Sequence, residues 1–206
     1  MYAVQPSFIL GFHGCYQSLA DRVFEGTERL NPKKNSYDWL GHGIYFWENS
    51  PERALKWAEE KLSRASKDVR AREAPGVIGA VIDLGYCLSL FETKGIDAVR
   101  SAHASLAAAL AAIGKPLPEN RSAAGEGDQV LRELDCAVIE ALHASRTKDK
   151  KLRSFDSVRG PFFEGNRLYT GSGFQEKNHV QICVRNPNCI KGYFRVLTPL
   201  EDHPMP

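Results

Sequence analysis

Two short segments near the N-terminus combine glycine with histidine and aromatic residues. Residues 12–14 (FHG) follow a short apolar run, and residues 41–46 (GHGIYF) follow a polar stretch. Because a glycine lets a ligand approach the backbone closely, the N–H and C=O groups of Gly14 could hydrogen-bond a planar carboxamide. The imidazole of His13 could in turn reach a sugar hydroxyl. The first segment therefore has the chemistry to bind a flat amide attached to a sugar.

The second segment adds aromatic surfaces to this site. Gly43 lies at the entry to an expected strand, where a residue without a side chain keeps space open for a bound molecule. Tyr45 and Phe46 must point to opposite faces of that strand, so that one faces a cleft while the other enters the core. Trp57 follows on an amphipathic helix and could form a second wall. Two aromatic walls with backbone hydrogen-bonding groups between them suit an aromatic amide such as nicotinamide.

Residues 12–14 and 41–46 resemble the first two motifs of the diphtheria-toxin and poly(ADP-ribose) polymerase branch of the ADP-ribosyltransferases, which is named for a His-Tyr-Glu triad. The resemblance implies that NAD is the substrate and that His13, as the triad histidine, holds its ribose hydroxyls. By the same resemblance, Gly14 would bind the nicotinamide amide and Tyr45 would stack on the nicotinamide ring. The similarity covers the N-terminal third of the chain well and the last 30 residues loosely.

Three more residues are candidates for binding NAD. Trp57 would take the place of a second stacking aromatic in the helix after the second motif. Ser50 lies where the family often has a serine near the nicotinamide amide, and it is also a good N-cap for a helix that begins with Pro51. Arg159 is a candidate for the diphosphate of NAD, because a guanidinium matches phosphate bidentately. The alternative for Arg159 is an ion pair with Asp156 in a loop.

The third motif of this branch is a glutamate at the start of a late strand. It polarises the 2′-hydroxyl of the nicotinamide ribose and favours an oxocarbenium-like transition state. Residues 178–184 (NHVQICV) stand at that place here, so the glutamate position falls on His179 or, two residues on, Gln181. Glu164 and Glu176 precede the strand, and either could fold into the site. Superfamily members that lack this glutamate often transfer a single ADP-ribose, so we expect mono-ADP-ribosylation rather than chain growth.

The resemblance predicts a transferase that cleaves NAD, by glycosyl transfer, and delivers ADP-ribose to a macromolecular acceptor, either protein or nucleic acid. Three alternatives stay open: an NAD glycohydrolase, a non-catalytic module that binds NAD, ADP-ribose or a nucleic-acid end, and an RNA 2′-phosphotransferase of the same fold. By analogy, a small domain of this kind would suit a bacterial toxin or phage-defence effector, with a neutralising antitoxin as partner.

Composition places few further limits on function. Hydrophobic residues make up 43% of the 206 residues and charged residues 25%, which is ordinary for a soluble globular protein. The net charge of +2 gives no strong attraction to nucleic acid, although residues 146–153 form a local basic run that could contact phosphate. The five cysteines form no CxxC pair, so we expect neither a disulfide framework nor a metal site. Without an apolar run of roughly 20 residues or a basic leader, we expect a cytoplasmic protein with no membrane partner.

The pattern of elements predicts an α+β fold over residues 1–206 as a single domain. Residues 11–14 are expected to form a turn after the first strand, and residues 88–90 to extend the third. The resemblance implies the split antiparallel sheets of the ADP-ribosyltransferases, with NAD in the cleft between them. Strands are expected at residues 7–12, 43–47, 76–84, 180–184 and 189–196.

Helices are expected at residues 18–25 and from Pro51 to about Lys67, where apolar residues recur with helical spacing. A helical insert is expected near residues 95–145, with helices at 96–113 and 130–144 joined by a flexible connection at 114–128. Residues 155–177 contain four glycines and no clean period, which predicts a long loop. Residues 201–206 are expected to be a frayed tail.

Overall fold

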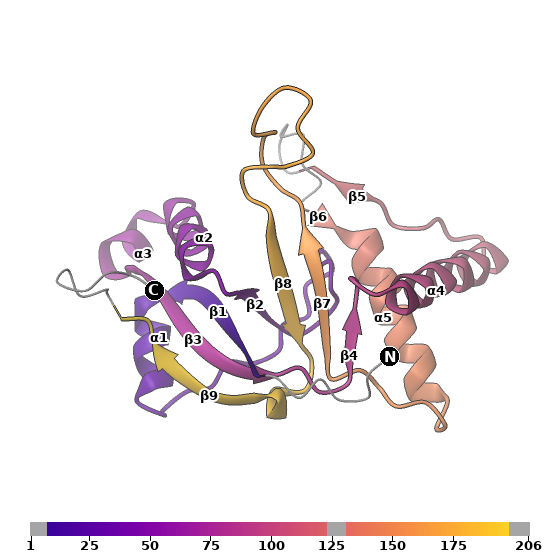
Figure 1. Ribbon diagram of the computed structural model, residues 1–206, viewed down its shortest axis with the longest axis horizontal. Coiled ribbons are helices and arrows are strands. Elements are labelled where there is room, and N and C mark those ends of the chain that lie inside the picture. Colours follow the sequence, from indigo (N-terminus) through magenta and orange to yellow (C-terminus); the bar gives the residue numbers. More distant parts are fainter. Residues whose placement is uncertain (1–7, 123–130, 198–206) are drawn as a thin grey trace.

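A seven-stranded sheet forms the centre of the protein in the computed structural model, which describes residues 8–122 and 131–197 (Figure 1). Its strands are β1 (Phe8–Tyr16), β2 (Ile44–Glu48), β3 (Pro75–Asp83), β4 (Cys87–Ser89), β7 (Ser157–Phe162), β8 (His179–Val184) and β9 (Ile190–Arg195). They lie in the order β4-β7-β8-β2-β1-β3-β9, and all neighbours are antiparallel except β4 and β7. The short strands β5 (Asn120–Arg121) and β6 (Leu131–Arg132) form a second, two-stranded sheet.

Helices flank the two ends of the sheet (Figure 1). The helices α1 (Gln17–Phe24), α2 (Pro51–Ser63) and α3 (Lys67–Arg72) lie around β1 and β3, whereas α4 (Thr93–Ala112) and α5 (Glu133–Lys148) lie beside β4. A single 3₁₀ turn, η1 (Pro187–Cys189), connects β8 to β9. The combination of a mostly antiparallel sheet with helices confirms the predicted α+β class.

The sheet is nearly divided between β1 and β2. β1 pairs with β3 at nine positions but with β2 at only two, where Gly11 lies opposite Glu48 and Phe12 opposite Trp47. We call the unpaired interval between residues 13–16 of β1 and residues 44–46 of β2 the split. The two separate sheets expected from the sequence are therefore one sheet, because these two residue pairs keep its halves joined.

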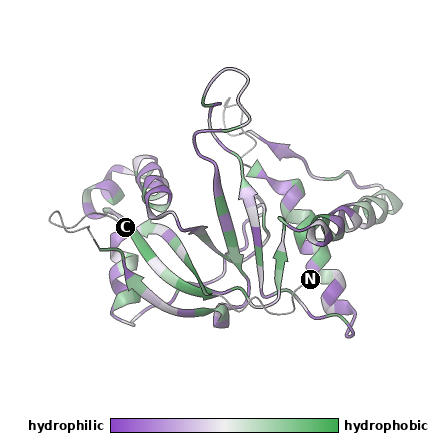
Figure 2. Ribbon diagram, viewed as in Figure 1, coloured by the Kyte–Doolittle hydropathy of each residue, from purple (hydrophilic) through white to green (hydrophobic). Residues whose placement is uncertain are grey.

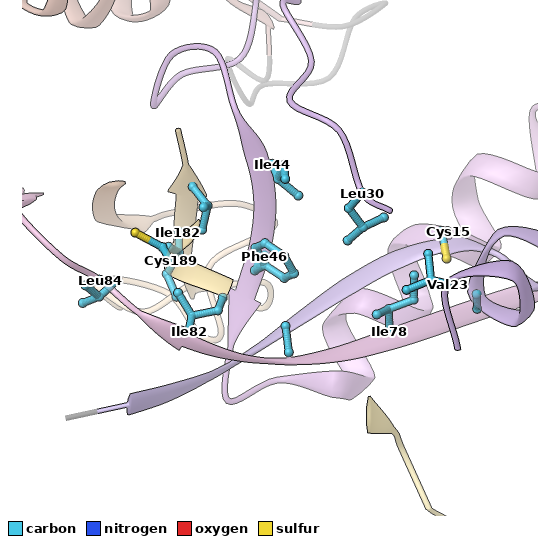
Figure 3. Packing of buried hydrophobic residues seen from close by; sticks show 13 residues of the cluster. Cys15, Val23, Leu30, Ile44, Phe46, Ile78, Ile82, Leu84, Ile182 and Cys189 are labelled. Carbon is cyan, nitrogen blue, oxygen red and sulfur yellow. The ribbon is translucent and has the colours of Figure 1, made fainter. Parts of the chain in front are cut away.

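Apolar side chains fill both faces of the sheet. On one face, Phe46, Ile78 and Ile82 are fully buried in a cluster that also includes residues of α1 (Figure 3). On the other face, α2 packs onto β1 and β3, and its Ala54 and Ala58 are fully buried. Figure 2 shows that the ribbon of α2 and α3 is otherwise mostly hydrophilic, as expected for helices with one side in solvent.

The expected boundaries near the first two motifs need correction. β1 continues through His13 and Gly14 to Tyr16, because β3 offers pairing partners along the whole stretch, so the turn expected at residues 11–14 is wrong. The helix expected to reach Lys67 ends at Ser63. A separate helix, α3, begins at Lys67 and is capped by Ser66, whose hydroxyl accepts a hydrogen bond from the N–H of Val69.

The second half of the chain is also more regular than expected. Residues 155–177 are not one long loop, because β7 lies within them and pairs with both β8 and β4. Residues 88–90 do not extend β3, since the chain turns at Gly85 and β4 pairs with β7 instead. The helical insert is confirmed as α4 and α5, which pack against each other. Residues 123–128 of the predicted connection and the tail at 201–206 lie outside the described residues.

Candidate functional site

His13 lies at the split and bridges β1 to β2. Its Nδ1 is 2.8 Å from the backbone oxygen of Tyr45, and because a carbonyl can only accept, Nδ1 carries the proton and donates. The side chain of His13 thus takes the place of a backbone donor from β1, whose backbone pairing with β2 stops at Phe12. Burial lowers the pKa of His13 to about 4, so the ring is neutral near pH 7 and its Nε2 is left as an acceptor. A hydroxyl group could donate to that nitrogen.

The peptide groups of Gly14 face the split. Along an antiparallel strand, the N–H and C=O of one residue point to the same side, and successive residues alternate. The oxygen of Leu10 accepts from Asn49 on the β2 side, whereas the N–H of Gln17 donates to Ala74 on the β3 side. By this alternation Gly14 directs its N–H and C=O toward β2, whose pairing with β1 ends at Phe12. These groups are therefore placed to bind a ligand in the split.

The absent side chain of Gly14 makes room for helix α2. A Cβ atom at this position would lie 2.2 Å from the backbone oxygen of Ala54 and 3.3 Å from Cε3 of Trp57. The helix can therefore pack on β1 only where residue 14 is glycine. The sequence reasoning assigned this glycine to ligand approach alone, and the structure adds this packing requirement.

Trp57 is the aromatic residue nearest to Gly14 on the helix side. Its ring lies 5.6 Å from that of Trp47, centroid to centroid, and the Nζ of Lys61 lies 5.3 Å above it. Trp57, Glu60 and Lys61 of α2 line a surface hollow together with Arg64, the C-cap residue of the helix. The structure thus brings Trp57 beside the first motif, where the sequence placed a stacking residue.

Tyr45 belongs to the protein core rather than to an open wall. Its hydroxyl accepts a hydrogen bond from the N–H of Leu40 and donates to the oxygen of Gly41, at 2.9 Å each. The ring packs with apolar residues of α5 and β7, and burial raises the pKa of the hydroxyl well above its usual value. Phe46 lies in the cluster on the opposite face, which confirms the predicted alternation of the two rings. Tyr45 thus closes the turn of the second motif.

The other residues of the second motif are held by backbone contacts and by the insert. Gly43 exchanges two backbone hydrogen bonds of 3.0 Å with Lys33, so its N–H and C=O are already paired. The carboxylate of Glu140, on α5, accepts from the N–H of His42 at 2.8 Å and forms an ion pair with Arg185. Gly41 has a φ of +81°, which favours glycine. The helical insert therefore fixes the shape of this motif.

Arg159 is not brought to the split as predicted, and for Ser50 the structure shows its place at the start of α2. Ser50 is the N-cap residue of α2, but its side chain makes no capping hydrogen bond. Arg159 lies on β7, not in a loop, and its guanidinium contacts both carboxylate oxygens of Glu48, at 2.5 and 2.7 Å. Its register partner is Ile182, so it lies on the sheet face opposite to that of Gln181. Its ion-pair partner is also not Asp156, which contacts Arg153 instead.

His179 and Gln181 lie on the face of the sheet that α2 covers. Gln181 is opposite Trp47 in β2, and its Oε1 accepts a 2.6 Å hydrogen bond from Nε1 of Trp39. The ring of His179 lies between those of Phe162 and Trp47, at centroid distances of 5.3 and 6.2 Å. Its Nδ1 is 2.5 Å from the oxygen of Lys177 and must donate to it, whereas its Nε2 is buried and has no partner among the residues that the structure describes. Burial lowers the pKa of His179, so the neutral ring offers Nε2 as an acceptor.

Of the two loop glutamates, only Glu164 folds toward His179. Its Oε2 accepts a 2.9 Å hydrogen bond from Nη2 of Arg53, and the two side chains are 15% and 10% exposed. Glu176 contacts Asn166 at the surface instead. Sequence reasoning missed Arg53. It lies four residues before Trp57 and so on the same face of the helix, and a charged residue at such a position was the available signal.

Comparisons with known proteins give no relative for this chain: no protein-family model, no curated protein and no solved structure matches it. Within residues 8–122 and 131–197, no helix has the length and apolar character needed to cross a membrane.

Acid is expected to destabilise the fold between pH 6.5 and 4. Burial lowers the pKa of His13 and of His143, on α5, from 6.5 to about 4. The unfolded chain takes up these protons below pH 6.5 and the folded chain only near pH 4, so stability is lost as the pH falls, by about 3 kcal/mol for each group. Urea unfolding of the wild type and of His143→Phe between pH 7.5 and 4 measures this. The variant should lose less stability over that range, and equal losses would contradict the assignment to His143.

Proposed function

We propose that this protein is a mono-ADP-ribosyltransferase that cleaves NAD at the split and transfers ADP-ribose to a macromolecular acceptor. The observation that carries the proposal is the position of Gly14, whose N–H and C=O face the split beside the ring of Trp57. A carboxamide needs one acceptor and one donor in its plane, and an aromatic ring beside it supplies a stacking surface. The nicotinamide end of NAD has this combination of groups.

The residues around Gly14 suggest how NAD would be held. Trp57 takes the stacking role in this proposal, because Tyr45 is packed in the core with its hydroxyl bonded on both sides. Lys61, which lies over the ring of Trp57, would move aside for the nicotinamide. The free acceptor of His13, Nε2, would receive a hydrogen bond from a ribose hydroxyl. Arg159 has no role in this arrangement, since Glu48 already holds it on the other face of the sheet.

His179 would supply the acceptor that a glutamate supplies elsewhere in the superfamily. In the neutral ring, Nε2 can accept a hydrogen bond from the 2′-hydroxyl of the nicotinamide ribose. That bond places more electron density on the ribose as positive charge develops on it. The C1′–N bond then breaks, its electron pair leaves with nicotinamide, and a nucleophile of the acceptor attacks C1′ and loses a proton. The products are nicotinamide and an acceptor with one ADP-ribose.

A non-catalytic NAD-binding module is the second candidate. The ion pair between Glu164 and Arg53 favours it, because the carboxylate nearest to His179 is already neutralised. NAD hydrolysis, with water in place of the acceptor, would use the same site and release free ADP-ribose. Binding without nicotinamide release identifies the module, and nicotinamide release without a labelled macromolecule identifies the hydrolase.

The proposal is tested by incubating the purified protein with ³²P-labelled NAD and cell lysate, and then digesting with protease or nuclease. We expect a labelled macromolecule whose label is removed by one of the two treatments. Trp57→Ala should reduce labelling by at least about tenfold and Trp57→Phe should restore most of it, because phenylalanine keeps a stacking face. Lys56→Ala, at an exposed position of the same helix, is the matched control. Absence of labelling in every lysate tested, together with absence of NAD binding, would contradict the proposal.

The predicted biological role remains part of the proposal. If the labelled acceptor is essential to a bacterial cell, the protein acts as a toxin or a phage-defence effector, and a co-expressed antitoxin should suppress the labelling. The role is tested by comparing the growth of two bacterial strains, one that expresses the wild type and one that expresses the Trp57→Ala variant.

A further inference from the structure

Arg53 is a buried arginine with unused hydrogen-bonding capacity. Only 9% of the residue is exposed, and of its three guanidinium nitrogens only Nη2 has a partner, which is Glu164. Within the described chain, Nε and Nη1 are buried without a partner. Buried guanidinium N–H groups normally have hydrogen-bond acceptors, so the two unpartnered nitrogens of Arg53 indicate that a further acceptor binds at this position.

Two more buried polar atoms have no partner in the described part of the chain, and both belong to side chains on the sheet face that α2 covers. Nε1 of Trp47 is a donor, and Nε2 of His179 is the acceptor described above. The rings of Trp47 and His179 lie 6.2 Å apart, and the charge of Arg53 acts on His179. The site therefore offers N–H donors from Arg53 and Trp47. Within the described residues, the ion-pair partner of Arg53 is Glu164, whose other oxygen lies 3.6 Å from Nζ of Lys177. None of the unpartnered atoms is open to water, so a ligand must displace part of the protein to reach them.

The segment that a ligand would displace is residues 163–178, which joins β7 to β8. It extends beyond the end of the sheet (Figure 1). Its ion pairs to α2 come from Glu164, which contacts Arg53, and from Lys177, whose Nζ is 3.5 Å from Oε1 of Glu60. Its large apolar side chains do not pack onto the body of the protein: Phe163, Leu168, Tyr169 and Phe174 are 55% to 62% exposed. Ion pairs, rather than a packed apolar face, thus fasten the segment over Arg53.

We propose that Arg53 is the centre of a phosphate-binding site that Glu164 masks in the ligand-free protein. A phosphate group can present two oxygens to a guanidinium, whereas Glu164 contacts Arg53 through one, and it has further oxygens for the unpaired N–H groups of Arg53 and Trp47. Binding would exchange Glu164 for phosphate and release the 163–178 segment from α2. The inference rests on the proposed function, because the diphosphate of NAD is the phosphate group which that function brings beside His179.

The test measures binding of inorganic diphosphate to the 206-residue protein by tryptophan fluorescence, since Trp57 lies one turn after Arg53 on α2 and Trp47 packs against Ala54, the neighbour of Arg53 in the sequence. We expect Glu164→Gln to tighten binding by about tenfold, because the competing charge is removed, and Arg53→Met to weaken it by at least about thirtyfold. Lys56→Met, an exposed cation of the same helix, should leave the affinity unchanged. Unchanged or weaker binding by folded Glu164→Gln would overturn the masking, and unchanged binding by folded Arg53→Met would overturn the site.

A second measurement needs no variant. Trypsin cleavage after Arg167, in the 163–178 segment, should become at least about threefold faster when diphosphate saturates the wild-type protein, because the segment is released. Saturable binding with no change in cleavage would contradict the displacement of Glu164.

Competition experiments distinguish the possible sources of the phosphate. NAD displaces diphosphate if the ligand is NAD, and a 5′-phosphorylated oligonucleotide displaces it if the ligand is a nucleic-acid end. If the affinity for diphosphate changes as expected in the Arg53 and Glu164 variants while NAD is neither bound nor cleaved, the phosphate site is supported and the proposed function is contradicted. If NAD is cleaved equally well by the wild type and by Arg53→Met, the proposed function is supported and the phosphate site is contradicted.

Discussion

Replacing His179 with alanine is expected to lower the rate of nicotinamide release from NAD by at least about 100-fold, the usual effect of removing a group that stabilises developing charge. The reason is specific to one atom. Because Nδ1 donates to the oxygen of Lys177, the unpartnered Nε2 is the only acceptor that this ring can offer to a ribose hydroxyl. The measurement is nicotinamide release by chromatography, with NAD affinity determined in parallel.

Two further variants separate this role from a structural one. His179→Glu should retain most of the activity, since a carboxylate also accepts from the hydroxyl, and His103→Ala, at an exposed position of α4, should have no effect. The pH profile gives an independent readout. The pKa of His179 is lowered, so the wild type should stay active as the pH falls through 6.5 and lose activity only at lower pH, when Nε2 is protonated. Full activity of a folded His179→Ala variant would rule out the role.

Gly14→Ala is expected to be the most damaging small substitution in the first motif. The added Cβ would lie 2.2 Å from the oxygen of Ala54, a backbone atom that can move only if α2 moves. We expect a loss of about 3 kcal/mol or more in the free energy of unfolding, at the upper end of what overpacking costs. Gly173→Ala is the matched control, because no atom of the described residues lies within 4 Å of the Cβ it would add.

The measurement for Gly14→Ala is urea unfolding of both variants, followed by NAD binding under conditions in which each is folded. Since α2 carries Trp57 and Arg53, a shift of the helix should also weaken NAD binding. A Gly14→Ala protein as stable as the Gly173→Ala control would show that the contact between β1 and α2 is not as close as described.

Local sequence signals predicted the elements whose own residues determine them. Ser50 and Pro51 mark the start of α2, and alanine-rich and amphipathic stretches mark α4 and α5. β7 was missed because Gly160 and Pro161 interrupt its pattern, and its stability comes from pairing with β4 and β8, which are distant in sequence. The continuation of β1 through His13 and Gly14 likewise depends on β3.

The candidate site shows the same limit. The spacing of His13, Gly14 and Trp57 predicted that they would lie together, and the structure brings them to or beside the split. The packed position of Tyr45 depends on α5, and the partner of Arg159 is Glu48, 111 residues away, so neither could be read from local sequence. The pairing of Arg53 with Glu164 is also a contact between residues 111 positions apart, so no local pattern predicts it.

The amide resonance of Gly14 tests the central proposal most directly. In a ¹⁵N-labelled protein titrated with NAD, we expect saturable shifts of the Gly14 amide and of the Trp57 indole N–H. The amides of Gly26 and Gly114, which have open surroundings in the described structure and lie outside the 163–178 segment, should not move. Nicotinamide alone should reproduce the shift of Gly14 at higher concentration. Saturable NAD binding that leaves Gly14 and Trp57 unmoved, or no NAD binding at all, would contradict the proposal that the split is the nicotinamide site.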